Sequence, residues 1–96
     1  MGKITKKYSG TFIIIPEKSE SVTEVTGSIN SIINENGGKI LKENLIGKKT
    51  LASPIKKKKE GVYYQVIFDA ETGSVSNMMR QFLINTNLLR SLIDRT

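Results

Sequence analysis

The sequence predicts a single α+β domain in which two helices cover one face of a four-stranded antiparallel sheet. Two observations lead to this fold class. Strand-like and helix-like patterns follow one another in the order strand, helix, strand, strand, helix, strand. The chain has 96 residues, of which 38% are hydrophobic, and this length fits one domain over residues 1–96 with a modest core.

The first predicted strand covers residues 8–15, which include Thr, Phe and three Ile, and it ends at Pro16. Residues 1–6 are expected to form a short basic extension in front of this strand. Because side chains alternate between the two faces of a strand, Ile13 and Ile15 should lie on the same face.

The first predicted helix follows Pro16, with Ser19 or Ser21 as its N-cap. Asn36 and two glycines end it, since glycine readily takes the left-handed conformation found after helices. Apolar side chains recur at helical spacing and form one stripe. These residues are Val22, Val25, Ile29, Ile32 and Ile33.

Two further strands are predicted over residues 39–54 and 62–70, joined by the polar stretch 56–61 at a hairpin tip. Gly47 in the middle of the first of them indicates a bulge or bend. The second strand alternates clearly. Its even-numbered residues on one face are Val62, Tyr64, Val66 and Phe68, and Tyr63, Gln65 and Ile67 lie on the other.

A second helix is predicted over residues 75–85, with Ser74 as its cap. A last strand is predicted over residues 88–95, although Leu88 and Leu89 could also extend the helix. Right-handed crossovers then favour the ferredoxin-like split βαβ arrangement, β-α-β-β-α-β, with both helices on one face. In this topology the first and third strands lie side by side in the centre of the sheet.

The composition excludes several kinds of chemistry. The chain has no Cys and no His, so zinc sites built from thiolate or imidazole are excluded, and the usual catalytic base and strongest nucleophile are missing. No segment is long and apolar enough to span a membrane. We therefore expect a protein without catalysis, functional metal, cofactor, membrane partner or small-molecule substrate.

The net charge of +6 indicates an anionic partner, because Lys and Arg release counterions when they contact phosphates. Lysines on or beside the predicted hairpin tip are the strongest candidates for such contacts. They are Lys48, Lys49, Lys56, Lys57, Lys58 and Lys59. The plainer interpretation of the four-lysine run is a solvated loop that protects the neighbouring strands from aggregation.

Two functions known on similar folds find less support. The strand around Tyr63 is similar to the aromatic strand of RNA-recognition motifs, but Tyr63 alone falls on the helix-free face, where that family uses several aromatic residues to stack bases. A free-standing single-stranded RNA binder stays open as the alternative. Acylphosphatase-like catalysis needs a phosphate-cradling loop with an Arg after the first strand, and residues 16–19 offer neither.

The helix-free face of the sheet predicts a protein partner. Ile13 and Ile15 on the first strand, Tyr63 and Ile67 on the third and Leu92 on the fourth should form one exposed apolar patch. A second chain is expected to pack on this patch. The exposed edge of the second strand is the alternative docking place, since a partner strand could add to the sheet there.

One stretch resembles a known family. Residues 47–55 read Gly-Lys-Lys-Thr-Leu-Ala-Ser-Pro-Ile, and a basic loop, Gly61 and two tyrosines follow. This pattern is similar to the signature of the sixth protein of the bacterial small ribosomal subunit, which reads Gly, two basic residues, any residue, Leu-Ala-Tyr-Pro-Ile, a basic loop, Gly and aromatics. The resemblance covers roughly residues 7–95. Ser53 departs from it, because the family usually has Tyr there.

The resemblance implies a ferredoxin-like fold, no enzymatic activity and a cytoplasmic, ribosomal location. It also implies binding to the central domain of the small-subunit ribosomal RNA, together with the eighteenth protein of that subunit. Matched positions expected to face RNA are Lys6, Lys7, Lys57, Tyr63, Arg90 and Arg95.

Overall fold

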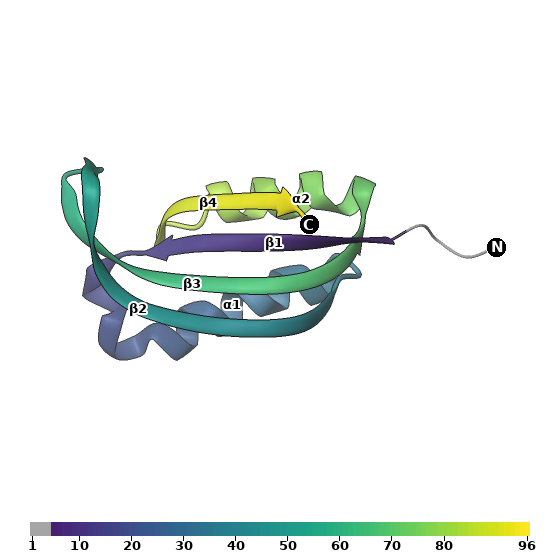
Figure 1. Cartoon of the computed structure of the whole chain (residues 1–96), viewed down its shortest axis with the longest axis horizontal. Coiled ribbons are helices and arrows are strands. Elements are labelled where there is room, and N and C mark those ends of the chain that lie inside the picture. The colour runs from purple at the N-terminus through teal and green to yellow at the C-terminus, as the bar shows by residue number, and fades with distance from the viewer. Residues whose placement is uncertain (1–4) are drawn as a thin grey trace.

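The computed structural model describes residues 5–96 and confirms the predicted fold class. Both helices lie on one face of a four-stranded sheet (Figure 1). The elements in chain order are β1 (Thr5–Ile14), the 3₁₀ helix η1 (Pro16–Ser21), α1 (Val22–Glu35), β2 (Lys39–Ile55), β3 (Lys58–Glu71), α2 (Thr72–Leu83) and β4 (Leu88–Arg95).

The sheet has the strand order β2-β3-β1-β4, and all neighbouring strands are antiparallel. The predicted central position of the first and third strands is therefore confirmed. Tyr8 of β1 pairs with Phe68 of β3 on one side and with Arg95 of β4 on the other. The first strand thus holds the two halves of the sheet together.

The main core lies between the sheet and the two helices. Phe12 of β1 is fully buried there, and its ring meets that of Phe82 from α2 edge-on at a centroid distance of 4.7 Å. From α1, the buried side chains are those of Val25, Ile29 and Ile33. The alternation predicted for β3 holds, since its even-numbered residues from Val62 to Ala70 are all buried in this core.

The end of α1 has the predicted glycine stop. Gly37 adopts a φ of +80°, in the left-handed region where glycine meets no steric penalty. The Gly38 N–H then donates to the Ile33 carbonyl at 2.8 Å, and the Gly37 N–H donates to the Asn34 carbonyl at 3.0 Å. This pair of bonds is a Schellman motif, which satisfies carbonyls at the helix end.

Several element boundaries differ from prediction. Residues 1–4 of the expected N-terminal extension lie outside the described residues, whereas Thr5 and Lys6 are already paired with β3. This pairing is possible because β3 runs from Lys58 to Glu71, well beyond the predicted residues 62–70. The second helix begins at Thr72, directly where β3 ends, so the predicted Ser74 cap is wrong.

The predicted bulge at Gly47 is confirmed. Gly47 has a φ of +111°, and the β2–β3 register shifts between Leu45 and Gly47. The register shifts again between Thr50 and Ile55, and the end of the hairpin leaves the plane of the sheet (Figure 1). The tip itself is a two-residue turn at Lys56 and Lys57, narrower than the predicted stretch 56–61.

Candidate nucleic-acid and protein interface

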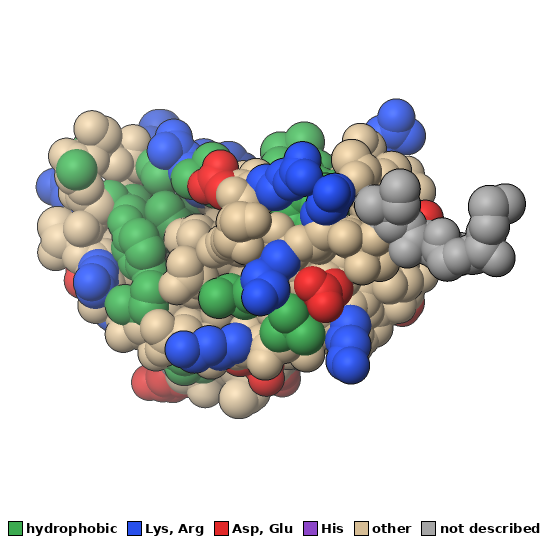
Figure 2. Space-filling model, turned by 45° about the vertical axis from the view of Figure 1, so that its right-hand side comes forward, with side chains coloured by type: hydrophobic (Ala, Val, Ile, Leu, Met, Phe, Trp, Pro, Cys, Tyr) green, Lys and Arg blue, Asp and Glu red, His purple; other side chains and the backbone are tan. Residues whose placement is uncertain are grey.

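The helix-free face of the sheet is covered at one end by the β2–β3 hairpin. Leu51 of β2 is buried against Ile13 of β1 and Leu89 of β4, and these three side chains form a second, smaller apolar cluster. Figure 2 shows hydrophobic side chains gathered beside the hairpin, with Lys and Arg side chains spread along this side of the molecule. The hairpin therefore closes a part of the sheet that the helices do not reach.

Gly61 of β3 makes this close approach possible. A Cβ atom at Gly61 would lie 2.4 Å from Cγ2 of Ile13 and 3.8 Å from Cδ2 of Leu51. Real Cβ contacts are essentially never that short, so any larger residue would push Ile13 aside. The glycine in the sequence pattern therefore serves the packing between β3 and the small cluster.

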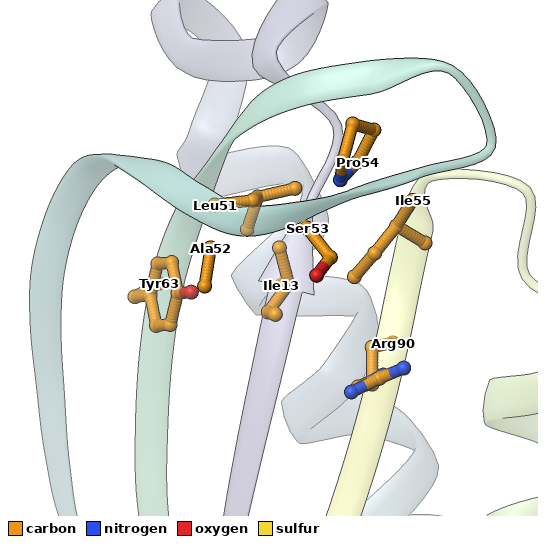
Figure 3. A pocket seen from close by; sticks show the side chains of 8 residues that line it. All are labelled: Ile13, Leu51, Ala52, Ser53, Pro54, Ile55, Tyr63 and Arg90. Atoms are coloured by element: carbon orange, nitrogen blue, oxygen red, sulfur yellow. The ribbon is translucent and has the colours of Figure 1, made fainter.

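A hollow of about 250 Å³ opens between the sheet and the curled hairpin. Its floor is one row of paired residues on three neighbouring strands, with Tyr63 on β3, Ile13 on β1 and Arg90 on β4. Residues 51–55 of β2 arch over this row, and the Ser53 side chain points toward it (Figure 3). The hollow thus combines an apolar floor, an aromatic ring and a cation.

The expectation that the helix-free face is left bare is wrong at this end. Ile13 is only 7% exposed, because Leu51 of the hairpin packs onto it. Ile15 lies one residue beyond β1, where it is half-buried against the same cluster, and its N–H donates to the Asn87 carbonyl at 2.9 Å. The alternation of strand residues had identified the face but not the hairpin that covers it.

The expected continuous apolar patch is also interrupted. Thr11 and Gln65, a polar cross-strand pair, lie between the small cluster and Ile67. Leu92 is 51% exposed and pairs with Thr11 from the other side. The Gln65 side chain donates to the Ser9 hydroxyl at 3.2 Å, which extends the polar stretch. Ile67 and Leu92 are therefore single apolar residues rather than parts of one patch.

The predicted RNA-facing residues gather at the two ends of the sheet. At the hairpin end, exposed lysines are carried by β2, by the turn and by the start of β3. They are Lys48, Lys49, Lys56, Lys57 and Lys59. Arg90 is exposed nearby at the hollow, and Tyr63 is half-buried against the small cluster.

Lys58 differs from its neighbours in the lysine run. Its ammonium group forms a salt bridge with the carboxylate of Glu17 in η1, and its side chain is 35% exposed. The hydrogen bond from Lys58 holds the pKa of the Glu17 carboxyl below its usual value. Nothing in the local sequence indicated this long-range pair, and it leaves Lys58 less available to a phosphate than the exposed lysines.

The second basic group lies at the other end of β1. Lys6 and Lys7 near the start of β1 are next to Arg95, since Tyr8 pairs with Arg95 and the Thr96 N–H donates to the Lys7 carbonyl at 3.1 Å. Lys7 also pairs with Asp69 of β3, so this end carries charges of both signs. The predicted basic residues thus form two separate groups.

A polar network that the sequence did not predict ties the edge strand to α1. The buried Tyr64 hydroxyl donates to Oε1 of Glu43 on β2 at 2.7 Å and lies 3.0 Å from Oδ1 of Asn30 on α1. Nδ2 of Asn30 also donates to Oε1 of Glu43, at 2.6 Å. The bond from Tyr64 and then the bond from Asn30 lower the pKa of Glu43. Burial, followed by the bond to Glu43, raises the pKa of Tyr64.

The outer edge of β2 carries the other exposed apolar group on the sheet. Leu41, Leu45 and Ile46 are between 41% and 49% exposed. β2 is an edge strand, so its outward backbone groups have no neighbouring strand in the sheet. The edge strand thus combines open backbone groups with exposed aliphatic side chains.

Comparison with known proteins decides the family. The family model described as "Ribosomal protein S6" matches residues 7–95. The chain belongs to this family. Two relatives named "Small ribosomal subunit protein bS6" are each 35% identical: that of Shouchella clausii over 91 residues (94% of this chain and 96% of the relative) and that of Corynebacterium aurimucosum over 92 residues (95% and 96%).

A solved S6 structure shows the same fold. The crystal structure of 30S ribosomal protein S6 from Thermotoga maritima superposes with a TM-score of 0.89 at 26% identity, covering 97% of this chain and 89% of that one. Membership in the S6 family confirms the resemblance carried by residues 47–55 and identifies the chain as a ribosomal protein of the small subunit. The expected ribosomal location is confirmed with it.

Within residues 5–96, no group of three or more acidic residues is placed to hold a metal ion. No helix in that range has both the length and the hydropathy needed to cross a membrane.

Proposed function

We propose that the protein is a structural component of the small ribosomal subunit that binds small-subunit ribosomal RNA and has no catalytic role. The observation that carries this proposal is the basic hairpin of an S6-family chain. Its exposed lysines lie beyond the helix-covered core, on the end of the β2–β3 hairpin, which we call the arm and whose residues 51–55 arch over Arg90. The resemblance to the family names the central domain of that RNA as the place of binding.

Phosphate contacts are expected mainly from the exposed lysines of the hairpin. Lys48 and Lys49 pair with successive residues of β3, so their side chains point to opposite faces of the arm. Lys56 and Lys57 project from the turn, and Lys59 follows on β3. A cationic arm of this kind neutralises phosphates without reading sequence, which suits a site defined by RNA shape.

The test is a comparison of two triple variants with equal charge. The hairpin variant replaces Lys56, Lys57 and Lys59 with Ala, and its control replaces Lys18, Lys39 and Lys42. Each lost phosphate contact should remove roughly 0.7 to 0.9 from the slope of log affinity against log salt. We expect the hairpin variant to flatten the slope by about two in filter binding to small-subunit RNA. Equal slopes for both variants would contradict a special role of the hairpin.

We further propose that a second ribosomal protein packs against the edge of β2. The resemblance names the eighteenth protein of the small subunit. Leu41, Leu45 and Ile46 are each 41% to 49% exposed within a short segment of this strand, whereas on the helix-free face Ile13 and Ile15 are covered and Ile67 and Leu92 are separated. Exposed apolar side chains close together in one segment point to an interaction site more than scattered ones do.

Two double variants distinguish the edge of β2 from the helix-free face as the place where the partner binds. Leu41→Asp with Ile46→Asp changes the edge, and Ile67→Asp with Leu92→Asp changes the face. We expect the edge variant to lose co-purification with the partner, while the face variant keeps it and both retain native circular dichroism. The reverse result would return the partner to the helix-free face.

The alternative, a free-standing RNA-recognition motif, finds less support in the structure. Among the described residues, Tyr63 is the single aromatic side chain on the helix-free face, and it packs against the small apolar cluster. An open platform for several stacked bases needs more aromatic surface than this.

A further inference from the structure

We propose that the hollow beneath the hairpin holds one unpaired nucleotide base of the RNA, with Arg90 beside the phosphate of that nucleotide. The inference rests on the proposed function and deepens it. The lysines would bind RNA through charge alone, whereas this site would bind it through a nucleotide base. Figure 3 shows the residues concerned.

The shape of the hollow suits a flat ring. Tyr63 and Arg90 flank Ile13 in one row across three strands. Neighbouring strands lie about 4.8 Å apart, so the backbones that carry Tyr63 and Arg90 are about 10 Å apart. Residues 51–55 arch over this row and leave about 250 Å³. A ring entering there would lie between Tyr63 and Arg90, beneath the arch and beside the small part of Ile13 that Leu51 leaves uncovered.

The chemistry of the lining favours a nucleotide over an apolar protein side chain. The Tyr63 ring and the Ile13 and Ile55 side chains supply apolar and aromatic contacts. Arg90 adds an exposed cation, and none of the described residues that line the hollow is acidic. A ligand that is aromatic at one end and anionic at the other can contact both halves, whereas an aliphatic side chain would gain nothing from Arg90.

The position of the hollow favours an unpaired nucleotide. Lys56 and Lys57 form the turn that immediately follows the arch, so phosphates on either side of the inserted base would have cations within the same arm. A base in a duplex is stacked and paired on both sides, and it cannot enter a pocket without being extruded. Single-stranded loops and bulges present their bases without that cost.

Ser53→Tyr provides the test, because it places a ring in the hollow. The Ser53 side chain points toward Ile13 and Ile55 (Figure 3), and Tyr is the residue that the family pattern usually has there, so the fold should tolerate it. The matched control is Ser76→Tyr. Ser76 is exposed on α2, on the opposite side of the sheet.

The probes are an adenylate RNA hexamer and a hexamer of the same charge that lacks all bases. One base stacked on an aromatic ring is worth about 1–3 kcal/mol, which is roughly 5- to 150-fold in affinity. We expect wild type and the Ser76 control to prefer the base-containing hexamer by about tenfold or more. Ser53→Tyr should bind both hexamers equally. In wild type, the methyl NMR signals of Ile13 and Ile55 should shift only with bases present.

Each other outcome overturns the proposal in a recognisable way. Equal binding of both hexamers by wild type, with a normal salt slope, would remove the base site and leave the proposed RNA function intact. No binding of RNA of any kind would overturn both. Loss of the partner protein in Ser53→Tyr, with RNA binding unchanged, would assign the hollow to a protein side chain. If Ser53→Tyr fails to fold, unshifted Ile13 and Ile55 methyl signals in wild type would decide against the site.

Discussion

On one face of the sheet, α1 and α2 bury a continuous core, whereas on the other face, within residues 5–96, only the curled end of the β2–β3 hairpin covers the strands. The first face holds the fully buried Phe12, Phe68 and Phe82. The second face has one small cluster around Ile13, followed by polar pairs and isolated aliphatic residues.

The two faces of the sheet differ in what their side chains contribute to the molecule. Burial of apolar area is the main stabilising contribution, so the helix-covered face should determine whether the chain folds. The covered end of the other face should determine the position of the hairpin. The lysines, the hollow and Arg90 all depend on that position. Substitutions on the two faces should therefore differ in kind as well as in size.

The largest expected effect is that of Phe12→Ala. Phe12 is fully buried between the sheet and α2, and its removal leaves a cavity. Such truncations cost about 3–5 kcal/mol of unfolding free energy. Leu92→Ala on the other face should change it by less than about 0.5 kcal/mol, since Leu92 is exposed. Urea denaturation measures both values, and equal losses would contradict the contrast between the faces.

An intermediate effect is expected for Gly61→Ala. The new Cβ would lie 2.4 Å from Ile13, so Ile13 or the hairpin must move, at a cost of about 1–3 kcal/mol. The control is Gly27→Ala on α1, where nothing lies within 4 Å. Alanine is a better helix former than glycine, so the unfolding free energy of this control should rise by up to about 1 kcal/mol. Faster amide exchange in the hairpin should accompany the Gly61 change only, and an unchanged hairpin would argue against its packing role.

The smallest effect concerns the network that ties β2 to α1. Tyr64→Phe should lower the unfolding free energy by about 1 kcal/mol near neutral pH, because the bond to Glu43 is lost. The pKa of Glu43 is lowered in the folded state, so its contribution is present above its ordinary pKa and is lost as pH falls through the folded value.

Denaturation at pH 7 and pH 3 tests this sign. The difference in unfolding free energy between wild type and Tyr64→Phe should narrow from pH 7 to pH 3, because falling pH approaches the lowered folded-state pKa of Glu43 and weakens its bond to Tyr64. When both proteins also carry Glu43→Gln, the difference in unfolding free energy between them should hardly depend on pH. A gap that widens toward acid would show that the carboxylate does not stabilise the pair.

Much of the fold could be predicted from the sequence because local patterns determine it. Helical spacing in α1, alternation in β3 and the glycines at 37 and 47 each have a local physical cause, and each was predicted correctly. The start of α2 was not, since β3 extends to Glu71 and determines where the helix can begin. That extension depends on pairing with β1, which is a long-range contact.

The site was predicted less completely for the same reason. Alternation assigns Ile13 and Tyr63 to a face, but it cannot tell that Leu51 folds back onto Ile13 or that Ser53 points toward it. The salt bridge between Lys58 and Glu17 joins residues far apart in the chain. Candidate residues could be named from their type and motif, whereas their grouping into two basic ends and one hollow required the three-dimensional arrangement.

The central position of β1 has a consequence for how the chain folds. Among the described strands β1 is synthesised first, yet one of its edges is paired with β4, which is synthesised after the others. Leu88, which packs in the same core as Ile14, becomes available only after both helices and the other three strands have been made. Contacts of such high sequence separation must overcome loop-closure entropy, which slows folding. During translation, the edge of β1 that pairs with β4 therefore has no strand partner from this sheet until β4 has been made.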